Sequence, residues 1–285
     1  MLSNRHYICL SVGTILQSSS LRNYIYITSK MSVPILSGKI FLLITGASQG
    51  IGRQIAESFA PLLGDGSSIL LLARNAIGLQ GTVDKLPKGL IIHTESVDLS
   101  IATADKLKGT AGATQFEKAV VVHNAASIGD LTKPTVTMTD FKIWREYYDL
   151  NVFSPAVLNG VFMKVFNDDT KVARLVINIT SFSGIQAFKF MGYYCSGKAA
   201  REMFFKVFAV ENPSVNVLNY SPGPVKTDML QSIHTVIGQV EGREGYEELA
   251  AKRSVLTTEQ TVNRLLEVLK LQNYKSGDHF DYFNN

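Results

Sequence analysis

Cysteine is scarce in this chain, because only Cys9 and Cys195 occur among its 285 residues. Two thiols are too few for a disulfide framework, and we interpret Cys195 as a reduced packing residue. The five histidines are scattered, and none stands at metal-ligand spacing from another His or from a Cys, so we expect no metal site. The chain carries both basic and acidic residues, in similar numbers. The formal net charge is +4 and the basic residues are dispersed, which argues against nucleic-acid binding.

Acidic residues are absent from the first thirty positions, which carry three Lys or Arg residues and several serines. This composition is typical of a mitochondrial transit peptide, or of a short secretory signal around residues 8–16. The apolar run there is too short to span a bilayer. The interpretation we favour is that the functional chain begins at Met31, that residues 1–30 are a leader outside the fold, and that residues 31–285 form one cytoplasmic domain. Mitochondrial import is the alternative.

From Lys39 onward, short apolar runs alternate with segments of helical spacing, which predicts a parallel sheet covered by helices on both faces. A sheet of this size commonly belongs to a single domain. We therefore predict an α/β fold with one doubly wound, Rossmann-type sheet. A helical pattern also covers residues 140–166. The predicted strands cover residues 40–44, 68–72, 90–93, 119–122, 174–180 and 215–220.

A glycine-rich turn joins the first predicted strand to a helix. Residues 45–52 read Thr-Gly-Ala-Ser-Gln-Gly-Ile-Gly. Glycines permit a tight turn and a close approach of the backbone to a pyrophosphate, which then lies against the positive end of the helix. The spacing differs from the commoner Gly-x-Gly-x-x-Gly fingerprint, and such a turn alone is also compatible with a structural loop.

A second pattern lies between Asn178 and Met203. Ser181 follows a predicted strand, and Tyr194 and Lys198 stand four residues apart at the head of a predicted helix. This spacing places the phenol and the ammonium on one helical face. A neighbouring ammonium favours the phenolate and lowers the tyrosine pKa, so the phenol can exchange a proton with a carbonyl oxygen that the serine holds. Alone, the pair is also compatible with an exposed Lys beside a half-buried Tyr.

Taken together and in this order, the glycine turn, Ser181, Tyr194 and Lys198 resemble the short-chain dehydrogenase/reductase family. The resemblance covers the chain from about Lys39 to its C-terminus and implies reduction of a carbonyl with a nicotinamide cofactor. It also implies that Asn151 completes the catalytic set by holding a helix bend and a water. The implied cofactor contacts are Gly46, Ser48, Gln49, Gly50, Ile51, Arg74, Asn75, Asp98, Leu99, Asn124, Tyr194, Lys198, Pro222, Gly223, Val225 and Thr227.

Arg74 indicates which nicotinamide cofactor is used. It follows the second predicted strand, where NAD-dependent enzymes of this class carry an acid that binds the ribose hydroxyls. A guanidinium there can instead bind a 2′-phosphate through charge-assisted hydrogen bonds, so we predict NADPH. Related NADPH enzymes often have a second basic residue in the glycine turn, where this chain has Gln49, which makes the preference less steep. A solvated surface arginine is the alternative.

Three positions carry further expectations. Asp98 lies near the adenine in the family, and it can equally cap the next helix. The family usually reads Asn-Asn-Ala-Gly where residues 123–126 read His-Asn-Ala-Ala. Ala126 adds a methyl group where the backbone normally approaches the cofactor, and we interpret His123 as a packed structural histidine. Residues 231–253 are polar and interrupted by glycine, which is typical of a substrate lid.

Several stretches outside the general motifs resemble the pterin-reducing members of the family, above all the tail around Asp281. In those members a C-terminal aspartate accepts paired hydrogen bonds from the guanidine-like edge of the pterin, and Asp281 matches it. The resemblance implies NADPH-dependent reduction of pterin side-chain ketones, with Ser181, Tyr194 and Asp281 on the substrate, and it implies a homodimer. The alternatives are a surface role for Asp281 and a broad-specificity carbonyl or diketone reductase.

Overall fold

The computed structural model describes residues 33–101, 115–237 and 254–284. The expected leader, residues 1–30, lies outside the described residues, as do residues 238–253 of the expected lid. None of the described helices is long and apolar enough to cross a membrane.

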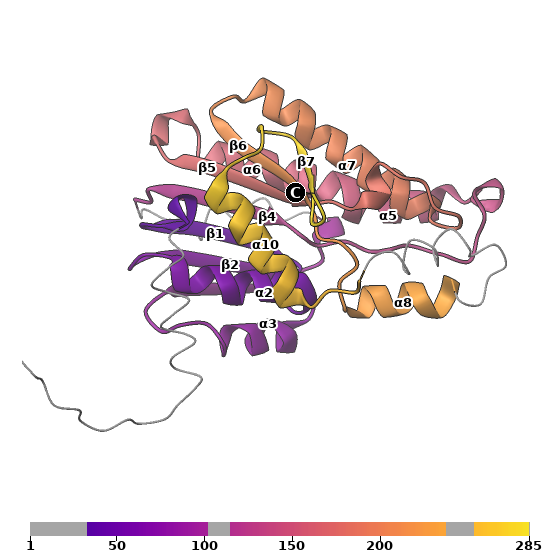
Figure 1. Ribbon diagram of the computed structural model, residues 1–285, viewed down its shortest axis with the longest axis horizontal. Coiled ribbons are helices and arrows are strands. Elements are labelled where there is room, and N and C mark those ends of the chain that lie inside the picture. The colour runs from indigo at the N-terminus through magenta and orange to yellow at the C-terminus, as the bar shows by residue number, and fades with distance from the viewer. Residues whose placement is uncertain (1–32, 102–114, 238–253, 285) are drawn as a thin grey trace, which may run out of the picture. The chain divides into compact units, whose positions relative to one another are not determined.

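Seven parallel strands form one sheet in the order β3-β2-β1-β4-β5-β6-β7 (Figure 1). Strands β1 to β6 confirm the six that the apolar runs predict, with ends that differ by a residue or a few. The short seventh strand, in the tail, pairs with β6. The strands are β1 (Ile40–Thr45), β2 (Ser68–Ala73), β3 (Ile91–Ser96), β4 (Lys118–His123), β5 (Ala173–Ile179), β6 (Val215–Ser221) and β7 (His279–Asp281).

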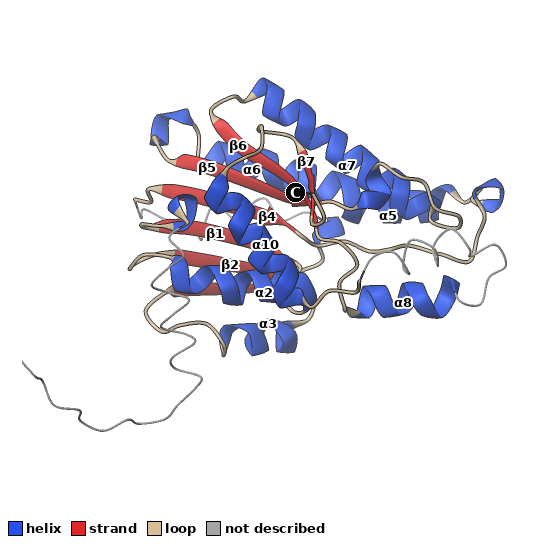
Figure 2. Ribbon diagram, in the orientation of Figure 1, coloured by secondary structure: helices blue, strands red, loops and turns tan. Residues whose placement is uncertain are grey.

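Helices cover both faces of this sheet, which confirms the predicted fold class (Figure 2). One face packs against α2 (Gly50–Phe59), α3 (Ala76–Val83) and α10 (Thr258–Leu271), and the other packs against α6 (Ser154–Val165) and α7 (Gly192–Glu211). The central strands β1 and β2 are buried along their whole length, which explains their continuous apolar sequence. The remaining helices are α5 (Phe141–Tyr148) and α8 (Asp228–Ile237).

The helical pattern over residues 140–166 is interrupted in the structure. A π-helical turn, Asp149–Phe153, separates α5 from α6. Asp140 begins the first of these helices by accepting hydrogen bonds from the backbone N–H groups of Lys142 and Ile143. Inserted π-turns of this kind often occur at functional sites.

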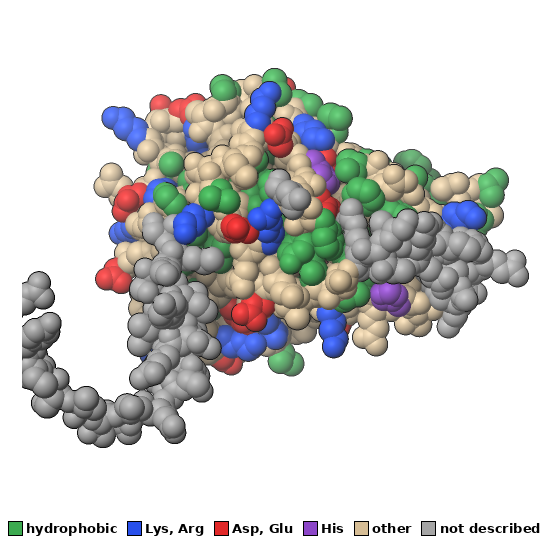
Figure 3. All heavy atoms as spheres, viewed as in Figure 1, with side chains coloured by type: hydrophobic (Ala, Val, Ile, Leu, Met, Phe, Trp, Pro, Cys, Tyr) green, Lys and Arg blue, Asp and Glu red, His purple; other side chains and the backbone are tan. Residues whose placement is uncertain are grey.

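Surface charge is mixed on the face drawn in Figure 3, where Lys and Arg side chains stand among Asp and Glu side chains. His123, at the end of β4, is 1% exposed and lies beside the buried ring of Phe205, with ring centroids 5.1 Å apart. Burial and the charge of Arg201 lower its pKa to about 3. His123 is therefore neutral and packed, which confirms the structural interpretation.

Candidate active site

Tyr194 and Lys198 lie on the first turns of α7 and face the sheet. Both are buried, with 8% and 6% exposure, and the Lys198 Nζ atom lies 5.6 Å from the centre of the tyrosine ring. Lys198 Nζ also donates a hydrogen bond of 2.8 Å to the carbonyl of Ile179, the last residue of β5. The helical spacing read from the sequence therefore brings both side chains to the carboxyl end of the sheet.

Ser181 stands just beyond β5 and begins a short 3-10 helix, Phe182–Gly184. Its hydroxyl oxygen accepts a hydrogen bond of 3.2 Å from the Ser183 N–H, and the Ser181 and Tyr194 side chains share a hydrogen bond. Serine, tyrosine and lysine thus converge at one point, although the tyrosine stands thirteen positions after the serine.

The electrostatics differ from the simple expectation that the lysine lowers the tyrosine pKa. Burial raises the pKa of Tyr194, while the Ser181 hydrogen bond and the charge of Arg201 oppose that rise. Burial also holds the pKa of Lys198 well below its ordinary value, and the charge of Arg201 lowers it further. Arg201 is therefore a further charged group that acts on the phenol, and sequence reasoning missed it.

Asn151 lies within the π-helical turn and is 4% exposed. Its amide nitrogen donates to the carbonyl of Tyr147 at 2.9 Å, and its amide oxygen accepts from the backbone N–H of Ser127 at 2.9 Å. The side chain therefore fastens the bend between α5 and α6 to the loop after β4. Its part in a proton relay stays a prediction.

A long cavity of about 600 Å³ runs along the carboxyl ends of the strands. The predicted cofactor residues Asp98, Gly223 and Val225 do not line it. Lys226, Asp228 and Met229 do, although the sequence analysis did not select them. The predicted residues in its wall are Gly46, Ser48, Gln49, Gly50, Ile51, Arg74, Asn75, Leu99, Asn124, Tyr194, Lys198, Pro222 and Thr227.

Two glycines of the turn, Gly46 and Gly52, leave no room for a side chain. A Cβ atom on Gly52 would lie 2.3 Å from the Gly46 carbonyl oxygen, and a Cβ on Gly46 would lie 2.9 Å from the Asn124 side chain. Gly46 also has a φ of +68°, which favours glycine. The bare backbone at the N-terminus of α2 forms the cradle that a dinucleotide pyrophosphate requires, so the residues fit such a group.

Arg74 and Asn75 follow β2 and line the long cavity. The Asn75 side chain accepts a hydrogen bond of 2.9 Å from the Gly78 N–H and so begins α3. Asp98 accepts hydrogen bonds from the N–H and the hydroxyl of Ser100, which lower its pKa, and the charge of Arg74 lowers it further. Asp98 therefore caps the short helix Leu99–Ile101, as one of the two readings of its sequence predicts.

A second cavity, of about 150 Å³, adjoins the first and is mainly apolar. Ser181 lies in its wall, and so do Gly223 and Val225, which we assigned to the cofactor from the sequence. Tyr194 and Thr227 line both cavities, so the phenol stands at the boundary between them. Apolar residues of the Ser181–Tyr194 loop and of α8 complete the wall; they are Phe182, Phe188, Met191, Leu230 and Ile233.

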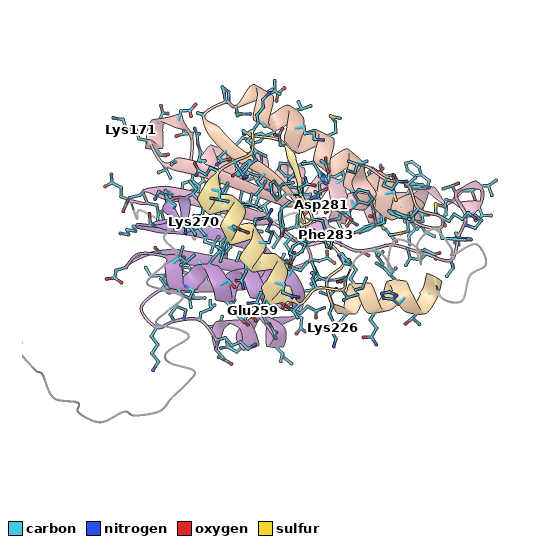
Figure 4. All side chains as sticks on the ribbon, in the orientation of Figure 1. Lys171, Lys226, Glu259, Lys270, Asp281 and Phe283 are labelled. Carbon is cyan, nitrogen blue, oxygen red and sulfur yellow. The ribbon has the colours of Figure 1, made fainter. Side chains whose placement is uncertain are left out.

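Asp281 ends β7 and pairs with Ser221 at the end of β6. It is 4% exposed, and its carboxylate accepts hydrogen bonds from the Ser221 hydroxyl at 2.7 Å and from the Phe283 N–H at 3.1 Å. Asp281 and Phe283 lie beside each other in Figure 4. Ser221 lines the apolar cavity, whereas Asp281 stands behind it. The aspartate is therefore a buried residue next to the site, and the alternative of a surface role is wrong.

Comparison with known proteins assigns the chain to a family. A family profile described as short chain dehydrogenase matches residues 41–237. Sepiapterin reductase of Xenopus tropicalis is 35% identical over 254 residues, which are 87% of this chain and 97% of that protein. Sepiapterin reductase of Bos taurus is 34% identical over 257 residues, covering 87% and 96% of the two chains. A putative short chain dehydrogenase of Escherichia coli CFT073, solved in complex with NADPH, has a TM-score of 0.68 at 22% identity, covering 88% and 99%.

Proposed function

The chain belongs to the short-chain dehydrogenase family, and from that membership we propose that it reduces a ketone with NADPH. The observation that carries the proposal is the position of Tyr194 in the wall shared by the long and the apolar cavity. A hydride donor in one cavity and a ketone in the other meet at that phenol. An enzyme of this class needs this arrangement, because hydride and proton must reach the same carbonyl group.

The long cavity holds the cofactor. The glycine turn receives the pyrophosphate, Arg74 receives the 2′-phosphate, and Lys198 and Thr227 lie at the other end, close to the reaction. NADPH, when bound, supplies the hydride. Lys198 donates one N–H to the Ile179 carbonyl, and a further N–H of the same nitrogen can donate into the cavity that it lines.

The chain's own groups handle the ketone oxygen. Ser181 donates a hydrogen bond that holds this oxygen and stabilises its growing negative charge. Tyr194 donates the proton that completes the alcohol, and its raised pKa keeps the phenol protonated at neutral pH, as a general acid requires. Asn151 fixes the bend between α5 and α6 behind the reacting groups through Tyr147 and Ser127.

The substrate is a pterin with a ketone on its side chain. The reactions are sepiapterin to dihydrobiopterin and 6-pyruvoyl-tetrahydropterin to tetrahydrobiopterin. Two curated relatives named sepiapterin reductase support this assignment by aligning over nearly their whole length. Asp281 supports it too, because it matches the aspartate of the pterin-reducing relatives and hydrogen-bonds the hydroxyl of Ser221, which lines the apolar cavity. In this proposal the carboxylate accepts hydrogen bonds from the paired N–H groups of the pterin.

Sepiapterin reduction with NADPH tests the proposal, with a simple diketone as the second substrate. Asp281→Asn keeps the shape of the side chain and replaces one acceptor oxygen by a donor. We expect kcat/KM for sepiapterin to fall about 100-fold, as for loss of a charged hydrogen-bond pair, with the diketone value unchanged. Asp278→Asn makes the same change at an exposed position of the tail and serves as the control. Equal handling of both substrates by all three proteins would indicate a broad-specificity carbonyl reductase instead.

We also propose that two copies of the chain pair through α6 and α7. Both helices present large apolar side chains to solvent: Val157 is 56% exposed on α6, and Met203, Val207 and Val210 are 60%, 47% and 82% exposed on α7. The stripe on α7 lies opposite the catalytic face, so a second copy covers it without blocking the cavities. Val207→Glu should convert the dimer to a monomer, which sedimentation or light scattering measures.

A further inference from the structure

Arg201 stands two helical turns after Tyr194 on α7 and is 2% exposed. Its guanidinium donates to the Asn178 side-chain oxygen at 2.5 Å, to the Ala125 carbonyl at 3.0 Å and to the His123 carbonyl. These partners are neutral oxygens and carry no full negative charge. Burial lowers the pKa of Arg201 to about 10, which still leaves it charged at neutral pH. Burying a cation without a negatively charged partner costs free energy, which suggests that the guanidinium has a further role here.

The hydrogen-bond partners of Arg201 lie next to the catalytic serine and next to the cofactor cavity. Asn178 lies three residues before Ser181 on β5, and the carbonyls of His123 and Ala125 flank Asn124, which lines the long cavity. Arg201 therefore fastens the tyrosine helix to the strand end that presents the serine and to the strand end that faces the cofactor.

The row of hydrogen bonds continues towards the tail. The Asn178 amide nitrogen donates to the Asn219 side-chain oxygen on β6 at 2.8 Å, and Asn219 donates to the carbonyl of Gly277 at 2.9 Å. Gly277 precedes β7, which ends in Asp281. One buried polar row thus joins β4, β5, β6 and the turn before β7, and its only cation is Arg201. Because each member is held by its neighbour, displacing the guanidinium disturbs the whole row.

We propose that Arg201 is a positioning residue that sets the geometry between the Tyr194 phenol and the Ser181 hydroxyl through its fork of hydrogen bonds to β4 and β5. This inference rests on the proposed ketone reduction. The planar guanidinium suits the task, because its donors point in fixed directions towards separate acceptors, which a lysine ammonium cannot reproduce.

The charge of Arg201 also affects a measurable quantity, the pKa of Tyr194. It opposes the burial that raises the pKa of Tyr194, so its removal raises that pKa further. Other titratable groups around the two residues contribute as well and must be kept constant: Tyr147 on α5, His123 on β4, and Cys195, Lys198 and Glu202 on α7. The alkaline limb of the kcat profile, where the phenol loses its proton, reports the tyrosine pKa.

Three variants separate geometry from charge. Arg201→Met removes both, Arg201→Lys removes the fork and leaves an amine whose charge burial disfavours, and Asn178→Ala removes one acceptor and leaves the cation in place. For Arg201→Met we expect kcat to fall about 100-fold, the size that a misplacement near 1 Å produces, with the KM values within about threefold. The alkaline limb moves to higher pH. In the other two variants kcat falls about tenfold at neutral pH, and in Asn178→Ala the limb stays at the wild-type position.

Arg145→Met removes an exposed guanidinium on α5 and is the matched control. Ultraviolet titration of each protein against its Tyr194→Phe counterpart gives the phenol pKa without any turnover. If the wild type reduces no ketone, the proposed function fails, and this titration still tests the charge of Arg201. If Arg201→Met keeps the wild-type kcat, or loses activity with an unmoved limb and titration, the inference is overturned. Should Arg201→Met not fold, a wild-type kcat in Arg201→Lys and Asn178→Ala overturns it equally.

Discussion

Replacing Gly52 with alanine tests how closely the glycine turn is packed. The added Cβ would lie 2.3 Å from the carbonyl oxygen of Gly46, whereas real Cβ contacts essentially never fall below 3.0 Å. The turn must therefore move by about 0.7 Å, the difference between the two distances. The Gly46 carbonyl also accepts a hydrogen bond of 3.2 Å from the Asn124 amide, which this movement strains.

The expected cost follows from two opposing effects. Overpacking of this kind costs about 1–3 kcal/mol. Alanine at a helical position regains about 1 kcal/mol relative to glycine. The free energy of unfolding should fall by up to about 2 kcal/mol, which urea denaturation measures. NADPH should bind about tenfold to 100-fold more weakly, because the displaced turn no longer matches the pyrophosphate, and quenching of protein fluorescence reports this binding.

Gly81→Ala provides the matched control within α3. A Cβ there would meet its nearest described atom, Arg53 Nη2, at 3.7 Å, which is an ordinary contact. We expect this variant to gain about 0.5–1 kcal/mol in unfolding free energy and to bind NADPH normally. A Gly52→Ala protein with wild-type stability and NADPH affinity would refute the packing argument, and so would an equal loss in both variants.

Arg74→Ala should raise the KM for NADPH about tenfold to 100-fold and leave the KM for NADH nearly unchanged, because the lost contact is a charged hydrogen bond. Kinetics with both cofactors measure this, and an equal rise in both KM values would contradict the prediction. Tyr194→Phe should lower kcat by about 10²–10⁴-fold while NADPH still binds, and a smaller loss would mean another proton donor. Glu202 has its pKa held at about 2 against an ordinary 4.5, because hydrogen bonds from His279, Lys206 and Thr180 outweigh its burial. The stability advantage over Glu202→Gln, up to about 3 kcal/mol, should be complete above pH 4.5 and vanish as the pH falls through 2. Urea unfolding across that range checks it, and a constant difference would contradict it.

The sheet could be predicted from the sequence because its signal is local. Strands buried on both faces require continuous apolar runs, and β1, β2 and β4 have them. The glycine turn is equally local, since its spacing alone determines where the backbone is bare. The π-turn at Asn151 could not be predicted in this way, because the apolar spacing of the surrounding helices continues through it without a break.

Contacts between distant segments lay beyond the sequence pattern. Asp281 and Ser221 are sixty residues apart, and only the register of β6 with β7 brings them together. Arg201 and His123 are 78 residues apart in the sequence. A charged residue within a helix is ordinarily assigned to solvent, so nothing local distinguishes a buried arginine from an exposed one.

Helix α7 illustrates why its buried face could not be chosen from hydrophobicity. Lys198, Arg201 and Glu202 face inward with 6%, 2% and 2% exposure, while Met203 and Val210 face solvent with 60% and 82%. The apolar spacing predicted a helix correctly, but it did not indicate the buried face, because these polar side chains share that face with core residues such as Phe205. Packing explains the polar inner side chains. The inner polar side chains satisfy the strand end that carries Asn178, Ile179 and Thr180, through an amide, a carbonyl and a hydroxyl. The outer apolar stripe is left for the second copy that we propose, so one helix serves catalysis on one side and assembly on the other.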